Sequence, residues 1–125
     1  MSRSGGERIQ IQRGDIYYCD LQSKQYQGSI QQGIRPVVIL QNDKGNKHSP
    51  TTIVAPITSQ NKPHLPTHAY IQTHDILEAT SDFSNSIVLF EQITTVNMLD
   101  LKNKIGAINL ESEAIKRALE ISIGL

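Results

Sequence analysis

The feature that most limits how this chain can fold is a series of short apolar runs separated by turn-forming residues. Each run is four to seven residues long, which is typical of β-strands and too short for most helices. The runs occupy residues 16–21, 37–40, 53–57, 68–71 and 87–93. The sequence therefore predicts a protein built mainly from β-strands.

The segments between these runs are short and rich in Gly, Pro, Asn and Ser. They occupy residues 28–33, 42–50, 61–66 and 80–86. None is long enough or helical enough for the crossover that parallel strands need, so the sheet should be antiparallel. Because several runs are apolar at successive positions, both faces of their strands should be buried, and we expect a small closed or nearly closed barrel.

Helical patterns appear only late in the chain. Residues 97–104 are predicted to form a short helix, and a second helix at the C-terminus should pack on the barrel. Asn109 is the expected N-cap of this second helix, with Glu111 and Glu113 near the positive end of its dipole. Its packed face follows spacings of three and four, at Ala114, Ile115, Ala118, Leu119, Ser122 and Ile123. The predicted fold class is mainly β, a small barrel of antiparallel strands with few helices.

The length and composition of the chain indicate one globular domain. A chain of 125 residues, 38% of them hydrophobic, can bury a core without disulfides or metals. We expect residues 1–12 to form a flexible tail, because the first eight are small and polar, and residues 13–125 to form the domain. The single cysteine cannot form an internal disulfide, and no apolar run approaches the ~18 residues of a membrane span. These features favour a cytoplasmic protein without a membrane partner.

The charged residues are divided unequally along the chain although they sum to zero. Residues 1–62 carry eight basic and four acidic side chains, and residues 63–125 carry four basic and eight acidic ones, so the halves are net +4 and −4. Such a division suits a protein with a basic surface that faces a polyanion.

The common signatures of metal enzymes and nucleotide-binding enzymes are absent from the sequence. No Gly-rich phosphate loop of either standard type occurs. Cys19 lies inside an apolar run, where a cysteine usually acts as a small buried hydrophobe. The histidines lack cysteine pairs or carboxylates at ligand spacing, so we expect no metal site and no cofactor. They are His48, His64, His68 and His74.

Two polar residues stand at the ends of predicted strands. Arg35 follows a Gly-containing loop and precedes Pro36, so its guanidinium should lie at the rim of the barrel, where it can meet a phosphate. The alternative is a solvated surface arginine. Thr58 ends its strand shortly after Pro56, whose missing amide donor marks a strand edge or a bulge. A lone threonine there is more often ordinary polar surface, so neither residue alone indicates a site.

Six motifs, in a fixed order from residue 13 to the last residue, carry a resemblance to a known family. They are RGDIYYCDL (13–21), GIRPVVILQND (33–43), GNKHSPTTIVAPITSQ (45–60), LPTH (65–68), IVLFEQI (87–93) and ALEISIGL (118–125). Together they resemble the MazF/PemK family of toxin endoribonucleases. A dozen motif positions in the right order are much more specific than a single signature.

The resemblance implies an SH3-like barrel that forms a homodimer and cuts single-stranded RNA at a short sequence without a metal ion. Such cleavage proceeds by 2′-hydroxyl attack, leaves 2′,3′-cyclic phosphate and 5′-hydroxyl ends, and inhibits translation and growth. The catalytic positions of the family fall on Arg35 and Thr58. The general base stays unassigned. The RNA-binding candidates are Lys24, Ser29, Gln31, Gln60, His68 and Gln92.

The resemblance also implies a protein partner. A cognate antitoxin of the MazE type should hold the toxin inactive through its own C-terminal segment. DNA should be bound only through that complex.

The chain departs from the family pattern at two positions, and each departure removes a charge. Ile30 replaces a glutamate in the first loop, and Thr94 replaces an arginine in the motif that here reads EQITT. These departures leave open a catalytically impaired relative that only binds antitoxin. A second alternative, which comes from toxins that resemble this family in fold, is a non-enzymatic barrel that binds DNA gyrase.

Overall fold

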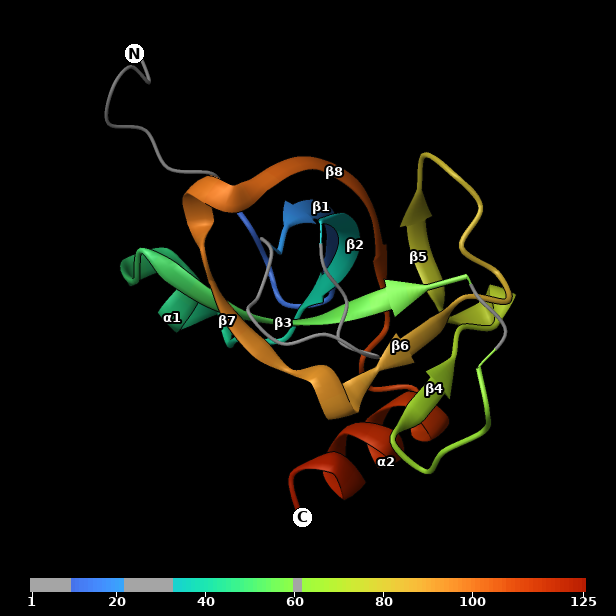
Figure 1. Ribbon diagram of the computed structural model, residues 1–125. Helices are drawn as coiled ribbons and strands as arrows, with labels where there is room; N and C mark the ends of the chain where they lie inside the picture. The colour runs from blue at the N-terminus through green and yellow to red at the C-terminus, as the bar shows by residue number, and fades with distance from the viewer. Residues whose placement is uncertain (1–9, 22–32, 60–61) are drawn as a thin grey trace.

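The computed structural model describes residues 10–21, 33–59 and 62–125 of the chain. This part consists of eight strands, two α-helices and three single turns of 3₁₀ helix (Figure 1). The strands are β1 (Asp15–Asp20), β2 (Ile34–Ile39), β3 (Thr51–Thr58), β4 (His68–Tyr70), β5 (Ile76–Ala79), β6 (Ile87–Leu89), β7 (Thr94–Asn97) and β8 (Leu101–Ile108). The helices are α1 (Asp43–His48) and α2 (Glu113–Ser122), and the turns are η1 (Thr73–Asp75), η2 (Phe90–Gln92) and η3 (Met98–Asp100).

All strand pairs are antiparallel, in the order β4-β6-β3-β2-β1-β8-β5, with β7 also paired to β3. Strand β3 is long enough to pair with two different strands along one edge. Its first half pairs with β7, and its last two residues pair with β6. In Figure 1 the strands curve around a common centre, with β8 arching over β1 and β2. The predicted fold class, a mainly β barrel of antiparallel strands with a C-terminal helix, is confirmed.

Both faces of the central strands are buried, as the unbroken apolar runs predict. Successive side chains of a strand point to opposite faces. On β1, Ile16 accordingly packs in one apolar cluster, whereas Tyr17 and Cys19 pack in a second. On β2, Val38 belongs to the first cluster, and its neighbour Val37 belongs to the second. The second cluster also includes Ile11, which lies within the predicted tail.

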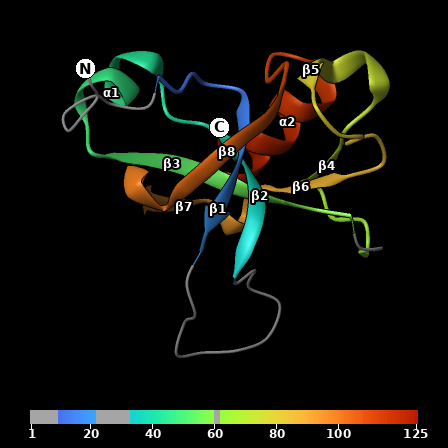
Figure 2. The ribbon, with the colours of Figure 1, turned by 90° about the horizontal axis from the view of Figure 1, so that it is seen from above.

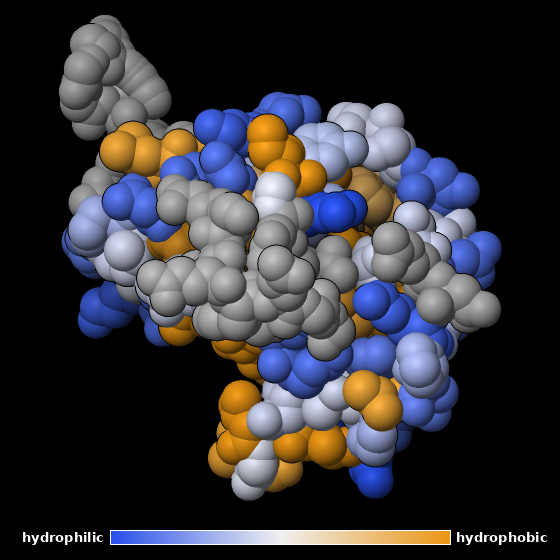
Figure 3. All heavy atoms as spheres, in the orientation of Figure 1, coloured by the Kyte–Doolittle hydropathy of each residue, from blue (hydrophilic) through white to orange (hydrophobic). Residues whose placement is uncertain are grey.

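Helix α2 covers the first cluster and packs against β4 and η2 (Figure 2). Ile115 and Ala118 are buried, and Leu119 is partly buried against the same cluster, which confirms the centre of the predicted face. The packed face ends there. Ile123 is exposed, and Figure 3 shows apolar side chains gathered over this end of the helix.

The predicted N-cap of this helix is wrong. The helix begins at Glu113, and Ser112 occupies the cap position. The side chain of Asn109 instead accepts a hydrogen bond from the backbone N–H of Glu111, which forms a turn before the helix. Asparagine favours such local turns as readily as caps, so its presence alone does not locate the first helical residue.

The predicted helix over 97–104 is also wrong. Only the single turn η3 forms there, and the chain continues as β8. Strand β8 pairs with β1 on one side and with β5 on the other, and these tertiary pairings outweigh local preference. Conversely, α1 forms within the predicted loop 42–50, where the side chain of Asn42 accepts from the N–H of Gly45 at 2.8 Å. The predicted strand 87–93 ends at Leu89 and continues as the turn η2.

Cys19 is fully buried in the second cluster, as its position in an apolar run predicts. Burial raises the pKa of its thiol to about 11, and the nearby Asp100 and Asp20 carboxylates add to the effect. The thiol is therefore neutral at physiological pH, which does not suit a nucleophile. None of the helices in the part of the chain that the structure describes is both long and apolar enough to cross a membrane.

Candidate active site

Arg35 and Thr58 lie on two neighbouring strands, each two residues beyond the last residue pair of β2 and β3. The register of β2 and β3 pairs Val37 with Pro56 and Val38 with Ala55, so paired residue numbers sum to 93. Extending this register by two residues places Arg35 opposite Thr58. Residues opposite each other in an antiparallel pair project to the same face of the sheet. The order of the strands thus brings together two residues that are 23 positions apart in the sequence.

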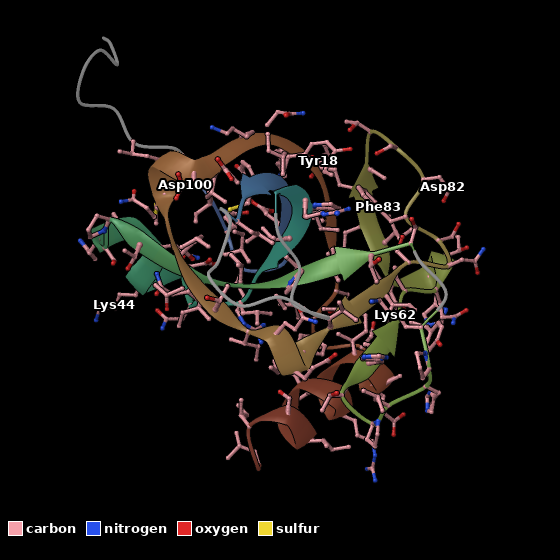
Figure 4. The ribbon with its side chains drawn as sticks, viewed as in Figure 1. Tyr18, Lys44, Lys62, Asp82, Phe83 and Asp100 are labelled. Carbon is pink, nitrogen blue, oxygen red and sulfur yellow. The ribbon has the colours of Figure 1, made fainter. Side chains whose placement is uncertain are left out.

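Both residues line one pocket of about 350 Å³. Its walls come from four strands and from the connection between β5 and β6, and Figure 4 labels Tyr18 on β1 and Asp82 and Phe83 on that connection. Buried apolar side chains from β3, β8 and the connection form part of the lining, and hydroxyl and charged groups form the rest. The lining residues are Tyr18, Arg35, Pro36, Ile57, Thr58, Ser59, Ser81, Asp82, Phe83, Ser86 and Ile105.

The two strand-end residues differ in exposure, and the difference suits different tasks. Arg35 is exposed, so its guanidinium can meet a ligand that arrives from solvent. Thr58 is only 7% exposed, and its backbone is held by pairing with Ile87 on β6. A planar guanidinium fork beside a positioned hydroxyl is a combination of donors that suits a phosphate.

His68 does not line this pocket. Its side chain is buried, and its Nε2 lies 2.9 Å from Oε2 of Glu91. The hydroxyl of Thr67 donates to the other carboxylate oxygen of Glu91 at 3.1 Å. Gln92 is half-buried on η2 and is likewise absent from the pocket lining. RNA contact by His68 and by Gln92 stays a prediction.

The other predicted RNA-binding residues, Lys24, Ser29, Gln31 and Gln60, lie outside the described residues, as does Ile30. Thr94, the second departure from the family pattern, is exposed on β7 and pairs with Val54. It does not line the pocket.

The connection between β5 and β6 contributes to the pocket, although its sequence predicts no site. The composition of residues 80–86 predicts only a loop, yet Ser81, Asp82, Phe83 and Ser86 all line the pocket. One local signal was available, because an aspartate two residues before a serine is typical of a side-chain-stabilised turn. That signal predicts the turn but not its place beside β2 and β3.

Within residues 10–21, 33–59 and 62–125, no three or more His, Cys, Asp or Glu side chains are grouped so that they could hold a metal ion.

Comparisons with known proteins agree along nearly the whole chain. Residues 12–123 match the family model described as PemK-like, MazF-like toxin of type II toxin-antitoxin system. Endoribonuclease MazF of Staphylococcus epidermidis is 47% identical over 118 residues, which span 92% of each chain.

Solved structures share the fold. An endoribonuclease from a mycobacterial species matches with a TM-score of 0.70 at 22% identity, over 94% of this chain and 95% of that one. A mycobacterial endoribonuclease in complex with its cognate antitoxin matches with a TM-score of 0.68 at 24% identity, over 92% and 96%. At these identities the likeness concerns the barrel-like fold.

Proposed function

This chain belongs to the PemK-like, MazF-like toxin family of type II toxin-antitoxin systems, and on that premise we propose that the pocket around Arg35 and Thr58 cuts single-stranded RNA without a metal ion. Family membership and the likeness to the staphylococcal relative make the chain an endoribonuclease toxin. The location of the site, the metal requirement and the cleavage chemistry are the proposal. The observation that carries it is the placement of Arg35 and Thr58 in one pocket.

Cleavage without a metal ion uses a nucleophile that RNA itself contains. The 2′-oxygen beside the cut attacks phosphorus, the bond from phosphorus to the 5′-oxygen breaks, and the products carry a 2′,3′-cyclic phosphate and a 5′-hydroxyl. The proton of the 2′-hydroxyl leaves to a base, and the departing 5′-oxygen takes up a proton. Negative charge builds on the phosphoryl oxygens between these events, so the protein accelerates the reaction by stabilising that charge.

Arg35 and Thr58 fit this requirement in different ways. The guanidinium keeps its proton under ordinary conditions and presents several N–H donors in one plane, so Arg35 stabilises the charged phosphoryl group and can protonate the leaving oxygen only transiently. The Thr58 hydroxyl donates to a non-bridging oxygen. Neither group is a good proton acceptor, and we leave the general base unassigned.

The first test is cleavage of a long RNA by purified protein in the presence of excess EDTA. We expect cuts in single-stranded segments. The 5′-hydroxyl and cyclic phosphate ends are identified by testing which end-specific enzymes act on the products. Cleavage that disappears with EDTA and returns with magnesium would refute the metal-free chemistry. No cleavage under any condition would favour the impaired relative, and inhibition of gyrase without cleavage would favour the gyrase-binding alternative.

We further propose that the active form is a homodimer, inhibited by an antitoxin whose acidic and apolar C-terminal segment covers the RNA-binding surface. A segment that folds on binding can span a large surface and compete directly with RNA. We expect a non-cleavable RNA to displace the antitoxin, and complex formation to slow as salt concentration rises. Simultaneous binding of RNA and antitoxin would contradict this blockade, and an active monomer in sedimentation equilibrium would contradict the dimer.

A further inference from the structure

The pocket that contains Arg35 also contains a carboxylate. Among the described residues that line it, Asp82 is the one acidic side chain, and it comes from the connection between β5 and β6. Figure 4 shows Asp82 next to Phe83 on this connection, at the side of the molecule where β3 ends. A carboxylate repels a phosphate group, so phosphate binding does not explain why Asp82 lines this pocket.

Asp82 is held in place by its own turn. Its Oδ1 accepts a hydrogen bond from the backbone N–H of Ser84 at 2.9 Å and a second from the Ser84 hydroxyl at 2.5 Å. These two donors engage one oxygen of the carboxylate. The same carboxylate lines the pocket, and its second oxygen, Oδ2, is not needed to hold the turn.

The connection itself is anchored to the barrel on both sides of Asp82. The N–H of Thr80 donates to the Ile105 carbonyl on β8 at 3.0 Å, and Phe83 is only 6% exposed. A Cβ on Gly106 would lie 2.6 Å from the ring of Phe83, so the glycine leaves the space that this ring occupies. Asp82 is therefore presented to the pocket from a fixed support rather than from a loose loop.

The charge state of Asp82 distinguishes between two roles, those of a general base and of a hydrogen-bond acceptor. The hydrogen bonds from Ser84 lower the pKa of its carboxyl group, so the group is charged at neutral pH. A general base works best when its pKa is near the working pH, which this carboxylate is not. A charged carboxylate is, however, a strong hydrogen-bond acceptor. Its natural partner in RNA is an amino group on a base edge, since adenine, cytosine and guanine carry one, whereas uracil carries a single ring N–H between two carbonyl oxygens.

We propose that Asp82 is a specificity-determining residue of this toxin, whose carboxylate accepts a hydrogen bond from the amino group of a base beside the cut phosphate. The inference rests on the proposed function, because it takes the pocket of Arg35 and Thr58 as the cleavage site. A pocket of about 350 Å³ is at the small end of ligand sites, with room for a phosphate and a neighbouring base. Substrates with uracil at that position should be cut more slowly, because uracil has no amino group and two carbonyl oxygens that repel the carboxylate flank its one N–H donor.

The test uses short single-stranded RNAs that contain a cut site mapped with the unaltered protein. Each of the four bases is placed in turn at the positions on either side of the cut. At one of them, we expect the unaltered protein to prefer bases with an amino group over uracil at least tenfold in kcat/KM. Asp82→Asn should reduce this preference at least tenfold, with the change falling mainly on kcat/KM, because an amide N–H₂ replaces the carboxylate oxygen that accepts from the base. Asparagine can still accept from Ser84, so the turn is retained.

Two further variants show whether a negative result concerns the role of Asp82 or the location of the cleavage site. Asp100→Asn removes the same charge from η3, outside the pocket, and should leave the base preference unchanged. Arg35→Ala reports on the cleavage site itself. Normal cutting by Arg35→Ala would defeat the proposed function, whereas an inactive Arg35→Ala beside an Asp82→Asn with unaltered preference would overturn only the role of Asp82. A hundredfold lower kcat for Asp82→Asn on every RNA would also overturn it, in favour of a role in proton transfer.

Discussion

Arg35→Ala is expected to lower the rate of RNA cleavage at least about a hundredfold, which corresponds to a loss of about 2.7 kcal/mol of transition-state stabilisation. The guanidinium is the positively charged group among the described residues that line the pocket, and no neighbour on that lining can supply a similar fork of donors. The measurement is single-turnover cleavage of a defined RNA. Because Arg35 is exposed and projects from the start of β2, truncation should leave the circular dichroism spectrum and the thermal unfolding curve unchanged.

Two companion variants test whether the effect depends on the planar guanidinium and on its position in the pocket. Arg35→Lys keeps the charge but loses the planar fork, so it should recover only part of the activity. Arg117→Ala removes an exposed arginine from α2, away from the pocket, and should cut normally. Full activity in Arg35→Ala, with an intact fold, would show that this residue is an ordinary surface arginine.

Thr58→Ala is expected to have an effect of the same order, at least about a hundredfold, because it removes one donor to the charged phosphoryl group. The position is buried at the end of β3, so the variant also loses a methyl group from a packed site and should be less stable by about 1 kcal/mol. The assay must therefore be run well below the unfolding temperature. Cleavage is measured under single-turnover conditions at saturating RNA.

The matched control is Thr58→Ser, which keeps the hydroxyl and loses the same methyl group. It should unfold at a similar temperature to Thr58→Ala but retain most of the cleavage rate. If the alanine and serine variants are equally slow, the methyl group or the strand end matters rather than the hydroxyl. If both cut normally, Thr58 has no catalytic role.

The central strands could be predicted from sequence because their signal is local. Strands β1, β2 and β3 are apolar at successive positions, and the structure buries both of their faces. The first half of strand β8 carries no such signal. Its residues Lys102, Asn103 and Lys104 are consecutive, polar and exposed, and only the pairing with β1 and β5 makes this segment a strand. Long-range pairing of this kind is not encoded in any short window of sequence.

The same contrast applies to the pocket. Arg35 and Thr58 could be selected from sequence because each lies at one end of an apolar run, close to a proline, and because both belong to family motifs. Asp82 could not be selected, because its turn with Ser84 is visible locally but its position beside Arg35 is not. That position depends on where β5, β6 and β8 lie in the sheet, and therefore on the completed fold.

The order of strands in the sheet also has a consequence for how the toxin is made. Asp15 at the start of β1 pairs with Ala107 on β8, a separation of 92 residues, and the first apolar cluster is completed by Ile115 of α2. Contacts between such distant positions slow folding, because a long loop must close before they form. During translation, β1 is synthesised long before β8, its partner in the sheet. The part of the pocket wall that Ile105 contributes therefore forms only after β8 has been made, long after Arg35 and Thr58 have left the ribosome's active centre.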